Sequence, residues 1–311
     1  MHKLYVIAGP TASGKTAIAV ELAKQLGGEV ISADSMQIYR GMDIGTAKPT
    51  LEERQNIPHH MIDIVNPDEA YSAALYQQQA RTAIEDVRTR GRVPILCGGT
   101  GFYINAVLYD VKFVEDEETD NSDTAMRDYF MDLAAKHGPE YLYAKLLEVD
   151  HAAASILHPN NVKRVARALS YCHVTGLLFS DYNAVQKKCP PVYDTVFCRL
   201  SVNRPMLYQR INQRAQAMFD AGLIAEVSGL MSQGYSPGLV SMQGIGYKEV
   251  VRFIQGECTQ PEAVDAVQQN SRRYAKRQET WFRHQNPDAL VVSADGQLVD
   301  IIEKIVQEIC H

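Results

Sequence analysis

The segment GPTASGKT, residues Gly9–Thr16, constrains the chain more than any other, because it fits the phosphate-binding pattern G-x-x-x-x-G-K-[S/T]. Residues 4–8, which precede it, form an apolar run typical of a buried strand. Residues 17–26, which follow it, carry apolar side chains at helical spacing until Gly27 and Gly28 end the pattern. The motif thus stands between a predicted strand and a predicted helix, which is the context in which such a loop binds phosphate.

The chemistry of this loop indicates a bound diphosphate or triphosphate. Its glycines let backbone N–H groups turn toward an anion, and the start of the helix adds partial positive charge. Lys15 adds a full charge, and the hydroxyl of Thr16 would bind Mg²⁺, the predicted cofactor. The predicted phosphate-binding residues are Gly9, Pro10, Thr11, Ala12, Ser13, Gly14, Lys15 and Thr16. A glycine-rich turn without a ligand is the alternative, and the loop alone does not separate a kinase, an NTPase and a transferase that releases diphosphate.

The composition is that of a soluble globular protein. Of 311 residues, 46% are hydrophobic and 22% charged, and no apolar run is long enough to span a membrane. The first residues lack a signal-peptide layout. Six cysteines occur without a C-x-x-C pair, which argues against a zinc site or a disulfide framework. These features predict a cytoplasmic protein. We also expect a monomer, although no sequence pattern determines the oligomeric state.

The charges are unevenly distributed along the chain. The formal net charge is -6, and residues 115–123 carry six acids and no base. Residues 272–283, in contrast, carry five bases and one acid, and Lys163, Arg164 and Arg167 form a second basic cluster. Because phosphate contacts are made by local patches, these clusters favour an RNA partner, with a solvated basic face as the alternative.

The order of the predicted elements indicates an α/β fold. Strands at 29–33, 59–65 and 92–97 alternate with helices, which predicts a parallel sheet with helices on both faces. Residues 40–49 read as a loop, and from residue 115 to 191 helical patterns follow one another. A strand at 195–201 is followed by two amphipathic helices at 205–221 and 224–233, a glycine-rich turn at 241–246 and a basic helix at 262–284. A strand at 289–293 and a last helix complete the pattern. We predict a P-loop NTPase-like parallel-sheet core from residues 1–114 and 192–311, with a helical insertion domain at 115–191.

Six blocks of sequence, in this order, resemble those of the bacterial tRNA dimethylallyltransferases. They are GPTASGKT at 9–16, DSMQ at 34–37 with Tyr39, GMDIGTAKP at 41–49, GGT at 98–100, MQGIGY at 242–247 and KRQETWFR at 276–283. Members of that family transfer a dimethylallyl group from its diphosphate to the exocyclic N6 of the adenosine next to the anticodon, tRNA position 37, and release diphosphate. The resemblance implies this activity, with dimethylallyl diphosphate and the tRNA anticodon arm as substrates. The acidic stretch 115–123 matches no block of the family.

The resemblance also implies a catalytic set of Asp34, Thr100 and Arg214. An adenine amino group is a weak nucleophile and must lose a proton as the C–N bond forms, so a carboxylate such as Asp34 is the natural acceptor. The residues alone leave a magnesium ligand open for Asp34, and they favour surface or capping roles for Asp43 and Asp63. Arg214 would stabilise the leaving diphosphate, with a solvated helix face as its alternative, and Thr100 could instead cap a helix.

The target adenosine must leave its stack to reach Asp34, and contacts with the surrounding RNA must offset that cost. We expect Ser35 and Gln37 to bind the base edge, basic side chains of the insertion and of the basic helix to hold phosphates, and Trp281 either to stack on a base or to belong to the core. The full set of implied tRNA-binding residues is Asp34, Ser35, Met36, Gln37, Thr100, Arg127, Lys163, Arg164, Arg167, Gln243, Gly244, Gly246, Lys248, Lys276, Arg277, Trp281 and Arg283.

Other functions remain open at this point. A small-molecule kinase, or an enzyme that prenylates free AMP or ATP, would need neither the basic clusters nor the helical insertion. A non-catalytic RNA-binding module with a nucleotide switch would not need the Asp-Ser-x-Gln block beside the phosphate loop.

Overall fold

The computed structural model of the chain describes residues 3–111, 113, 117–186 and 189–310. By its internal contacts the chain divides into two compact units, Met1–Leu108 together with Tyr193–His311, and Tyr109–Val192. The predicted start of the insertion, residue 115, lies outside the described residues.

The first unit is built on a parallel sheet. Its strands are β1 (Leu4–Ala8), β2 (Gly28–Ser32), β3 (His59–His60), β4 (Val93–Gly98), β5 (Thr195–Ser201) and β6 (Leu290–Ser293). They lie in the order β3-β2-β4-β1-β5-β6, and every neighbouring pair is parallel, which confirms the predicted α/β fold. The predicted strand 59–65 is too long: β3 ends at His60, because Met61 and Asp63 have positive φ angles of 62° and 57° that extended backbone does not allow.

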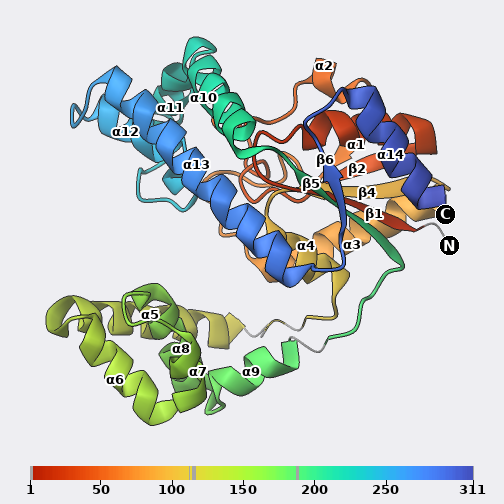
Figure 1. Cartoon of the computed structure of the whole chain (residues 1–311). Helices are drawn as coiled ribbons and strands as arrows, with labels where there is room; N and C mark the ends of the chain where they lie inside the picture. Colours follow the sequence, from red (N-terminus) through yellow and green to blue (C-terminus); the bar gives the residue numbers. More distant parts are fainter. Residues whose placement is uncertain (1–2, 112, 114–116, 187–188, 311) are drawn as a thin grey trace. The chain divides into compact units, whose positions relative to one another are not determined.

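Helices cover both faces of this sheet (Figure 1). Helix α1 (Lys15–Leu26) packs against α14 (Leu298–Cys310), and α3 (Ala73–Thr89) packs against α4 (Gly101–Leu108) on the opposite face. Ile18 and Leu22 of α1 are buried in one cluster with Ile95 of the sheet, which is the reason for their helical spacing in the sequence. A short helix α2 (Leu51–Arg54) was not predicted, and a capping box at Thr50 begins it.

A second hydrophobic cluster lies beside the sheet. It is formed by α10 (Arg204–Asp220), α11 (Leu223–Ser232), the 3₁₀ turn η1 (Ser241–Gln243), α12 (Tyr247–Ile254) and α13 (Gln260–Gln285), together with residues 38–42. Val267 of α13 belongs to this cluster, whereas Ala275 of the same helix belongs to the cluster around the sheet. Helix α13 therefore connects the second cluster to the sheet and brings its basic residues to the end of the strands.

The second unit is helical in its described part. It contains α5 (Glu117–His137), α6 (Pro139–Val149), α7 (His151–Ile156), α8 (Val162–Thr175) and α9 (Phe179–Gln186), and its own core includes Leu142, Leu146 and Leu169. Helix α9 was not predicted; Phe179 packs its ring 5.7 Å from that of Tyr171, a contact that leaves no periodic pattern in so short a segment. In neither unit is a described helix long and apolar enough to cross a membrane.

Candidate active site at the carboxyl end of the strands

Residues 9–16, the predicted phosphate loop, connect β1 to α1. Gly14 has φ +83°, a left-handed conformation that favours glycine, and α1 begins at the next residue, Lys15. The first-turn N–H groups of α1 lack partners within the helix and carry partial positive charge toward the loop. Lys15 Nζ donates to Pro10 O at 2.7 Å and closes the loop on itself. Ser13 Oγ is buried and finds no hydrogen-bond partner among the described residues.

Two cations lie at this loop without an ion pair among the described residues. The pKa of Lys15 is lowered to about 8, chiefly by burial and to a lesser extent by the charge of Arg214, while Cys97 and Asp34 act in the opposite direction. Burial also lowers the pKa of Arg214, and the charge of Asp34 opposes that shift. Arg214, on α10, donates from Nη2 to Thr11 Oγ1 and so contacts the phosphate loop. Burial thus disfavours the charged forms of Lys15 and Arg214, which have no anionic partner among the described residues. A bound anion would stabilise these charged forms.

Asp34 and Thr100 meet at the ends of β2 and β4. Asp34 Oδ1 accepts a hydrogen bond from Met36 N at 2.9 Å, which forms a tight turn directly after β2, while its Oδ2 makes no hydrogen bond within the described part of the chain. Thr100 Oγ1 accepts from Ser35 N at 3.1 Å and donates to Ser35 Oγ at 3.3 Å. Thr100 Oγ1 is thus bonded to Ser35 rather than to the first turn of α4, and one carboxylate oxygen of Asp34 remains free to accept a proton.

Two residues of α13 belong to this site although the sequence did not single them out. Gln278 Oε1 accepts from Thr11 N at 2.8 Å, and Gln278 Nε2 donates to Gly99 O at 2.8 Å, so this buried side chain joins the phosphate loop to the end of β4. Tyr274 lies close enough to Thr100 and Gln278 for both to affect its pKa, which burial raises to about 12. The only local signal was that Gln278 stands uncharged inside a basic run.

The side chain of Gln37 is occupied within the protein. Its Oε1 accepts from Ser32 Oγ at 3.1 Å, and its Nε2 donates to Ala47 O at 3.2 Å and to Thr46 O at 3.4 Å. Gln37 therefore holds the loop of residues 41–49 against the end of β2, and a contact with a base would compete with these bonds.

Asp43 and Asp63 have a partner that the sequence did not reveal. Both accept from the ammonium group of Lys48, whose side chain is only 4% exposed and also donates to Tyr39 O at 2.9 Å. A buried ammonium group is stable only when it is paired and hydrogen-bonded. The two carboxylates are therefore counterions of Lys48. Their side chains remain 60% and 43% exposed, so both are surface residues as predicted, and the pairing with Lys48 is what the sequence did not reveal.

The glycine-rich turn at 241–246 packs beside Met36. A Cβ atom at Gly244 would come within 2.4 Å of Met36 Cε, and Gly246 has φ +98° at the start of α12. Gln243 is exposed and donates to Pro237 O at 2.8 Å, and the Lys248 ammonium group lies 3.9 Å from Glu249. The two glycines thus serve close packing and a sharp turn, and Gln243 and Lys248 present polar groups beside them.

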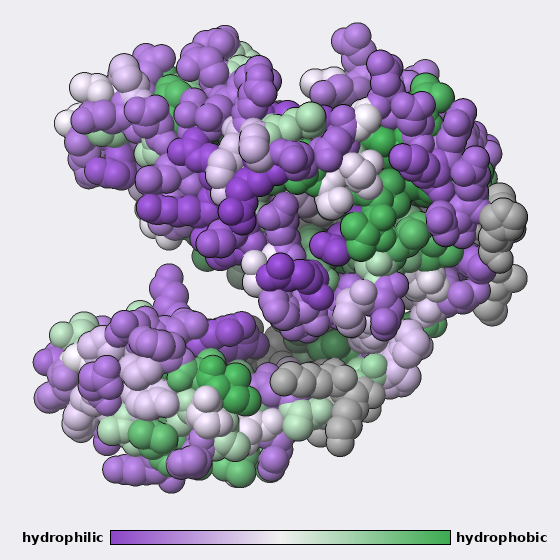
Figure 2. Space-filling view, in the orientation of Figure 1, coloured by the Kyte–Doolittle hydropathy of each residue, from purple (hydrophilic) through white to green (hydrophobic). Residues whose placement is uncertain are grey.

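The remaining basic residues lie on three helices, α5 and α8 in one unit and α13 in the other. Lys163, Arg164 and Arg167 are exposed on α8, and Arg127 is partly buried on α5. On α13, Lys276, Arg277 and Arg283 are exposed, and the face of this helix in Figure 2 is covered by hydrophilic residues. Trp281 is partly buried, and its ring packs so closely on Gly101 that a Cβ atom there would lie 2.1 Å from it. Trp281 therefore packs against the start of α4.

The residues present fit a magnesium ion only in part. The described residues hold no group of three or more His, Cys, Asp or Glu side chains suited to a metal. Mg²⁺ in phosphate sites is, however, usually held by one or two protein oxygens together with substrate phosphates. The hydroxyl of Thr16, in the first turn of α1, is compatible with such a shared site.

Comparisons with known proteins match nearly the whole chain. The model of the family described as IPP transferase matches residues 37–285. A tRNA dimethylallyltransferase of Bacillus pumilus (strain SAFR-032) is 49% identical over 279 residues, which cover 90% of this chain and 86% of the relative. The full-length tRNA isopentenylpyrophosphate transferase of Bacillus halodurans, a crystal structure, is 41% identical, covers 100% of this chain and 96% of that one, and has a TM-score of 0.73.

A more distant structure agrees. A eukaryotic dimethylallyltransferase, caught in crystallographic snapshots acting on tRNA, is 28% identical, with a TM-score of 0.81 over 100% of this chain and 78% of that one. These matches confirm the resemblance drawn from the six sequence blocks. The chain belongs to the IPP transferase family.

Proposed function

We infer that this protein transfers a dimethylallyl group from dimethylallyl diphosphate to a tRNA, and we propose N6 of the adenosine at position 37 as the acceptor. The observation that carries the inference is the meeting of a carboxylate and a phosphate loop at one edge of the sheet. Asp34 is close enough to Lys15 and Arg214 for its charge to affect the pKa of both. A proton acceptor beside an anion-binding loop suits a reaction in which an amine loses a proton as diphosphate leaves.

The leaving diphosphate develops negative charge, and fixed positive groups lower the free energy of that state. Lys15, Arg214 and the N–H groups at the start of α1 supply this charge where water is partly excluded. A magnesium ion at Thr16, when bound, would neutralise part of the diphosphate charge. Because Thr11 bonds to both Arg214 and Gln278, its side chain and backbone set the position of this anion-binding group.

The free oxygen of Asp34 is proposed to accept the N6 proton. Thr100, held by Ser35, would orient the amino group toward it. The exposed bases of α8 and α13 are proposed to hold tRNA phosphates, which would offset the cost of turning the adenosine out of its stack. The bonds of Gln37 to the 41–49 loop favour a role in shaping the base pocket over a direct contact with the base.

One assay tests the function directly. The protein is mixed with Mg²⁺, dimethylallyl diphosphate and an anticodon stem-loop that carries adenosine at position 37, and released diphosphate is measured. Matched controls replace the stem-loop with one carrying guanosine at that position, with AMP or with ATP. We expect diphosphate to be released in the mixture that contains the adenosine stem-loop and in none of the three controls. Release with AMP or ATP but not with RNA would replace the tRNA proposal with prenylation of a free nucleotide, and ATP consumption without RNA would support a kinase.

A further inference from the structure

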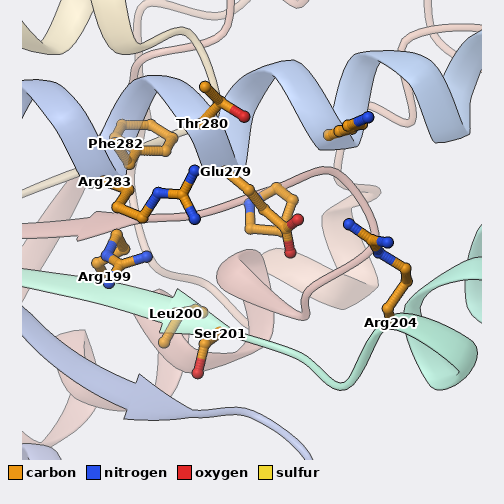
Figure 3. A pocket seen from close by; sticks show the side chains of 10 residues that line it. Arg199, Leu200, Ser201, Arg204, Glu279, Thr280, Phe282 and Arg283 are labelled. Atoms are coloured by element: carbon orange, nitrogen blue, oxygen red, sulfur yellow. The ribbon is translucent and has the colours of Figure 1, made fainter.

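A second basic pocket lies beside the phosphate loop. It has a volume of about 220 Å³ and is lined by residues at the end of β5, at the start of α10 and on α13, together with Pro10 of the loop. Figure 3 shows Arg199 of β5, Arg204 of α10 and Arg283 of α13 around the carboxylate of Glu279. Lys276 of α13 lines the same pocket. Arg199 and Arg204 belong to none of the sequence blocks that pointed to the site.

The charges of this pocket are not balanced. Arg199, Arg204, Lys276 and Arg283 face a single acid, Glu279. Among the described residues no ion pair joins any of these side chains to an opposite charge, and the buried Nε of Arg199 has no hydrogen-bond partner. Like charges held together without counterions repel each other, and an anion in the pocket would remove that repulsion.

This pocket is separate from the site around Asp34. Residues 276, 279, 280 and 283 recur at the three- and four-residue spacing of one helix face. Tyr274, Gln278 and Trp281 recur at the same spacing on the opposite face, where they contact Thr100, the phosphate loop and Gly101. Pro10 and Thr11 are neighbours in the loop, and Pro10 faces the basic pocket while Thr11 contacts Gln278. The phosphate loop therefore borders residues from both faces of α13.

We propose that the pocket formed by Arg199, Arg204, Lys276 and Arg283 is a second phosphate-binding site, which extends the proposed function and rests on it. Guanidinium groups present forked donors that match phosphate oxygens, and three of the four cations are arginines. Both proposed substrates carry this chemistry. The phosphate is either a phosphodiester of the tRNA backbone or the diphosphate of the donor or product, and Glu279 limits the affinity so that the anion can leave.

The test uses the full chain with three single variants. Arg204→Gln removes one cation that is exposed and has no ion pair among the described residues. Glu279→Gln removes the opposing acid, and Arg92→Gln is the matched control, an exposed arginine directly before β4 at the other end of the strands. Equal thermal midpoints for the three variants and the native protein establish that the fold is kept. One arm measures the affinity for the adenosine stem-loop over a salt series, and the other measures the affinity for inorganic diphosphate by calorimetry.

The two pocket variants should change the affinity for the bound probe in opposite directions. Arg204→Gln should weaken binding of one probe roughly tenfold, as expected for loss of a charge-assisted hydrogen bond, while Glu279→Gln strengthens binding of the same probe several-fold. A change in the RNA arm, with a smaller salt slope, assigns the pocket to the tRNA backbone, and a change in the diphosphate arm assigns it to the donor or product.

The proposal is overturned if both pocket variants bind the two probes with the same affinity as Arg92→Gln. It is also overturned if Arg204→Gln and Glu279→Gln change the affinity in the same direction. A fall in the thermal midpoint of Arg204→Gln that accounts for its weaker binding has the same consequence. Each of these results leaves the proposed function standing if the adenosine stem-loop still triggers diphosphate release. Failure of that release would instead reject the function, whatever the pocket variants do.

Discussion

At the scale of single residues, the role of Asp34 is the sharpest prediction. Asp34→Asn keeps an oxygen that can accept from Met36 N, so the turn after β2 should persist, but it has no basic oxygen for the N6 proton. Single-turnover rates should fall by roughly 10² to 10⁴, whereas the affinities for donor and tRNA should change far less. The rate and the donor affinity are measured over a Mg²⁺ series. Recovery of the rate at high Mg²⁺, together with reduced donor affinity, would make Asp34 a metal ligand instead.

The lowered pKa of Lys15 leads us to expect that donor binding depends on pH. Its pKa of about 8 in the free protein leaves about half of the ammonium groups uncharged at pH 8. A bound diphosphate favours the charged form, so the complex has a higher pKa and binds more protons than the free protein from about pH 8 upward. Donor affinity should therefore fall as pH rises through 8, with an uptake of about half a proton at that pH. Calorimetry in two buffers with different ionisation heats measures the uptake, and Lys15→Met, the control, should lack it.

At the scale of elements, α11 holds the loop of residues 41–49 through one carboxylate. Glu226 Oε2 accepts from Ile44 N at 2.7 Å and from Asp43 N at 3.0 Å, and Oε1 accepts from Gly45 N at 3.1 Å and from Tyr247 OH at 2.6 Å. Burial, together with the charge of Glu226, raises the pKa of Tyr247 and keeps its hydroxyl a donor. The loop in turn accepts hydrogen bonds from the side chain of Gln37, three residues after Asp34, so we expect Glu226 to act on the site by positioning this loop.

Glu226→Gln should therefore loosen this loop. The amide keeps one acceptor oxygen but directs its N–H groups at backbone donors that the carboxylate satisfied, at a cost of about 1–3 kcal/mol. We expect faster hydrogen exchange at the amides of residues 43–45, a raised KM for tRNA and an unchanged affinity for diphosphate. Glu257→Gln, which removes an exposed pair with Arg252, is the control. Unchanged exchange in the 43–45 segment would show that the loop does not depend on Glu226.

At the scale of the whole molecule, the proposed RNA surface is carried by two units with separate cores. Arg164→Ala on α8 and Arg277→Ala on α13 should each weaken tRNA binding and lower the slope of log affinity against log salt by about one for each phosphate that the variant no longer binds. Because Arg277 also lies 5.6 Å from the ring centre of Tyr274, Arg277→Lys is included, and it should keep the slope. Filter binding over a salt series measures the affinity for tRNA and its salt slope for each variant. If neither alanine variant changes the slope, the two clusters are solvated faces.

Local order in this chain follows from neighbouring residues, and that is why it could be predicted. The strand, the loop with its Gly14 and the helix after it occupy consecutive positions, and so do the residues of the basic run on α13. Hydrophobic spacing also predicted the parallel sheet, since buried strands alternate with helices. The short segments β3, α2 and α9 were mispredicted or missed, because two to eight residues are too few to establish a period.

The candidate site itself depends on contacts between residues far apart in the sequence. Gln278 meets Thr11 across 267 positions, Arg214 meets it across 203, and Glu226 meets Gly45 across 181. Such hydrogen bonds impose no pattern on neighbouring residues, so Tyr274, Gln278 and Glu226 passed unnoticed, and the Lys48 pair and the arginine pocket beside Pro10 were equally invisible. The sequence alone therefore determined the phosphate loop, the secondary structure around it and the family. The tertiary structure decided which side chains surround the loop, because only the packing of α10, α11 and α13 against the ends of the strands brings them within bonding distance.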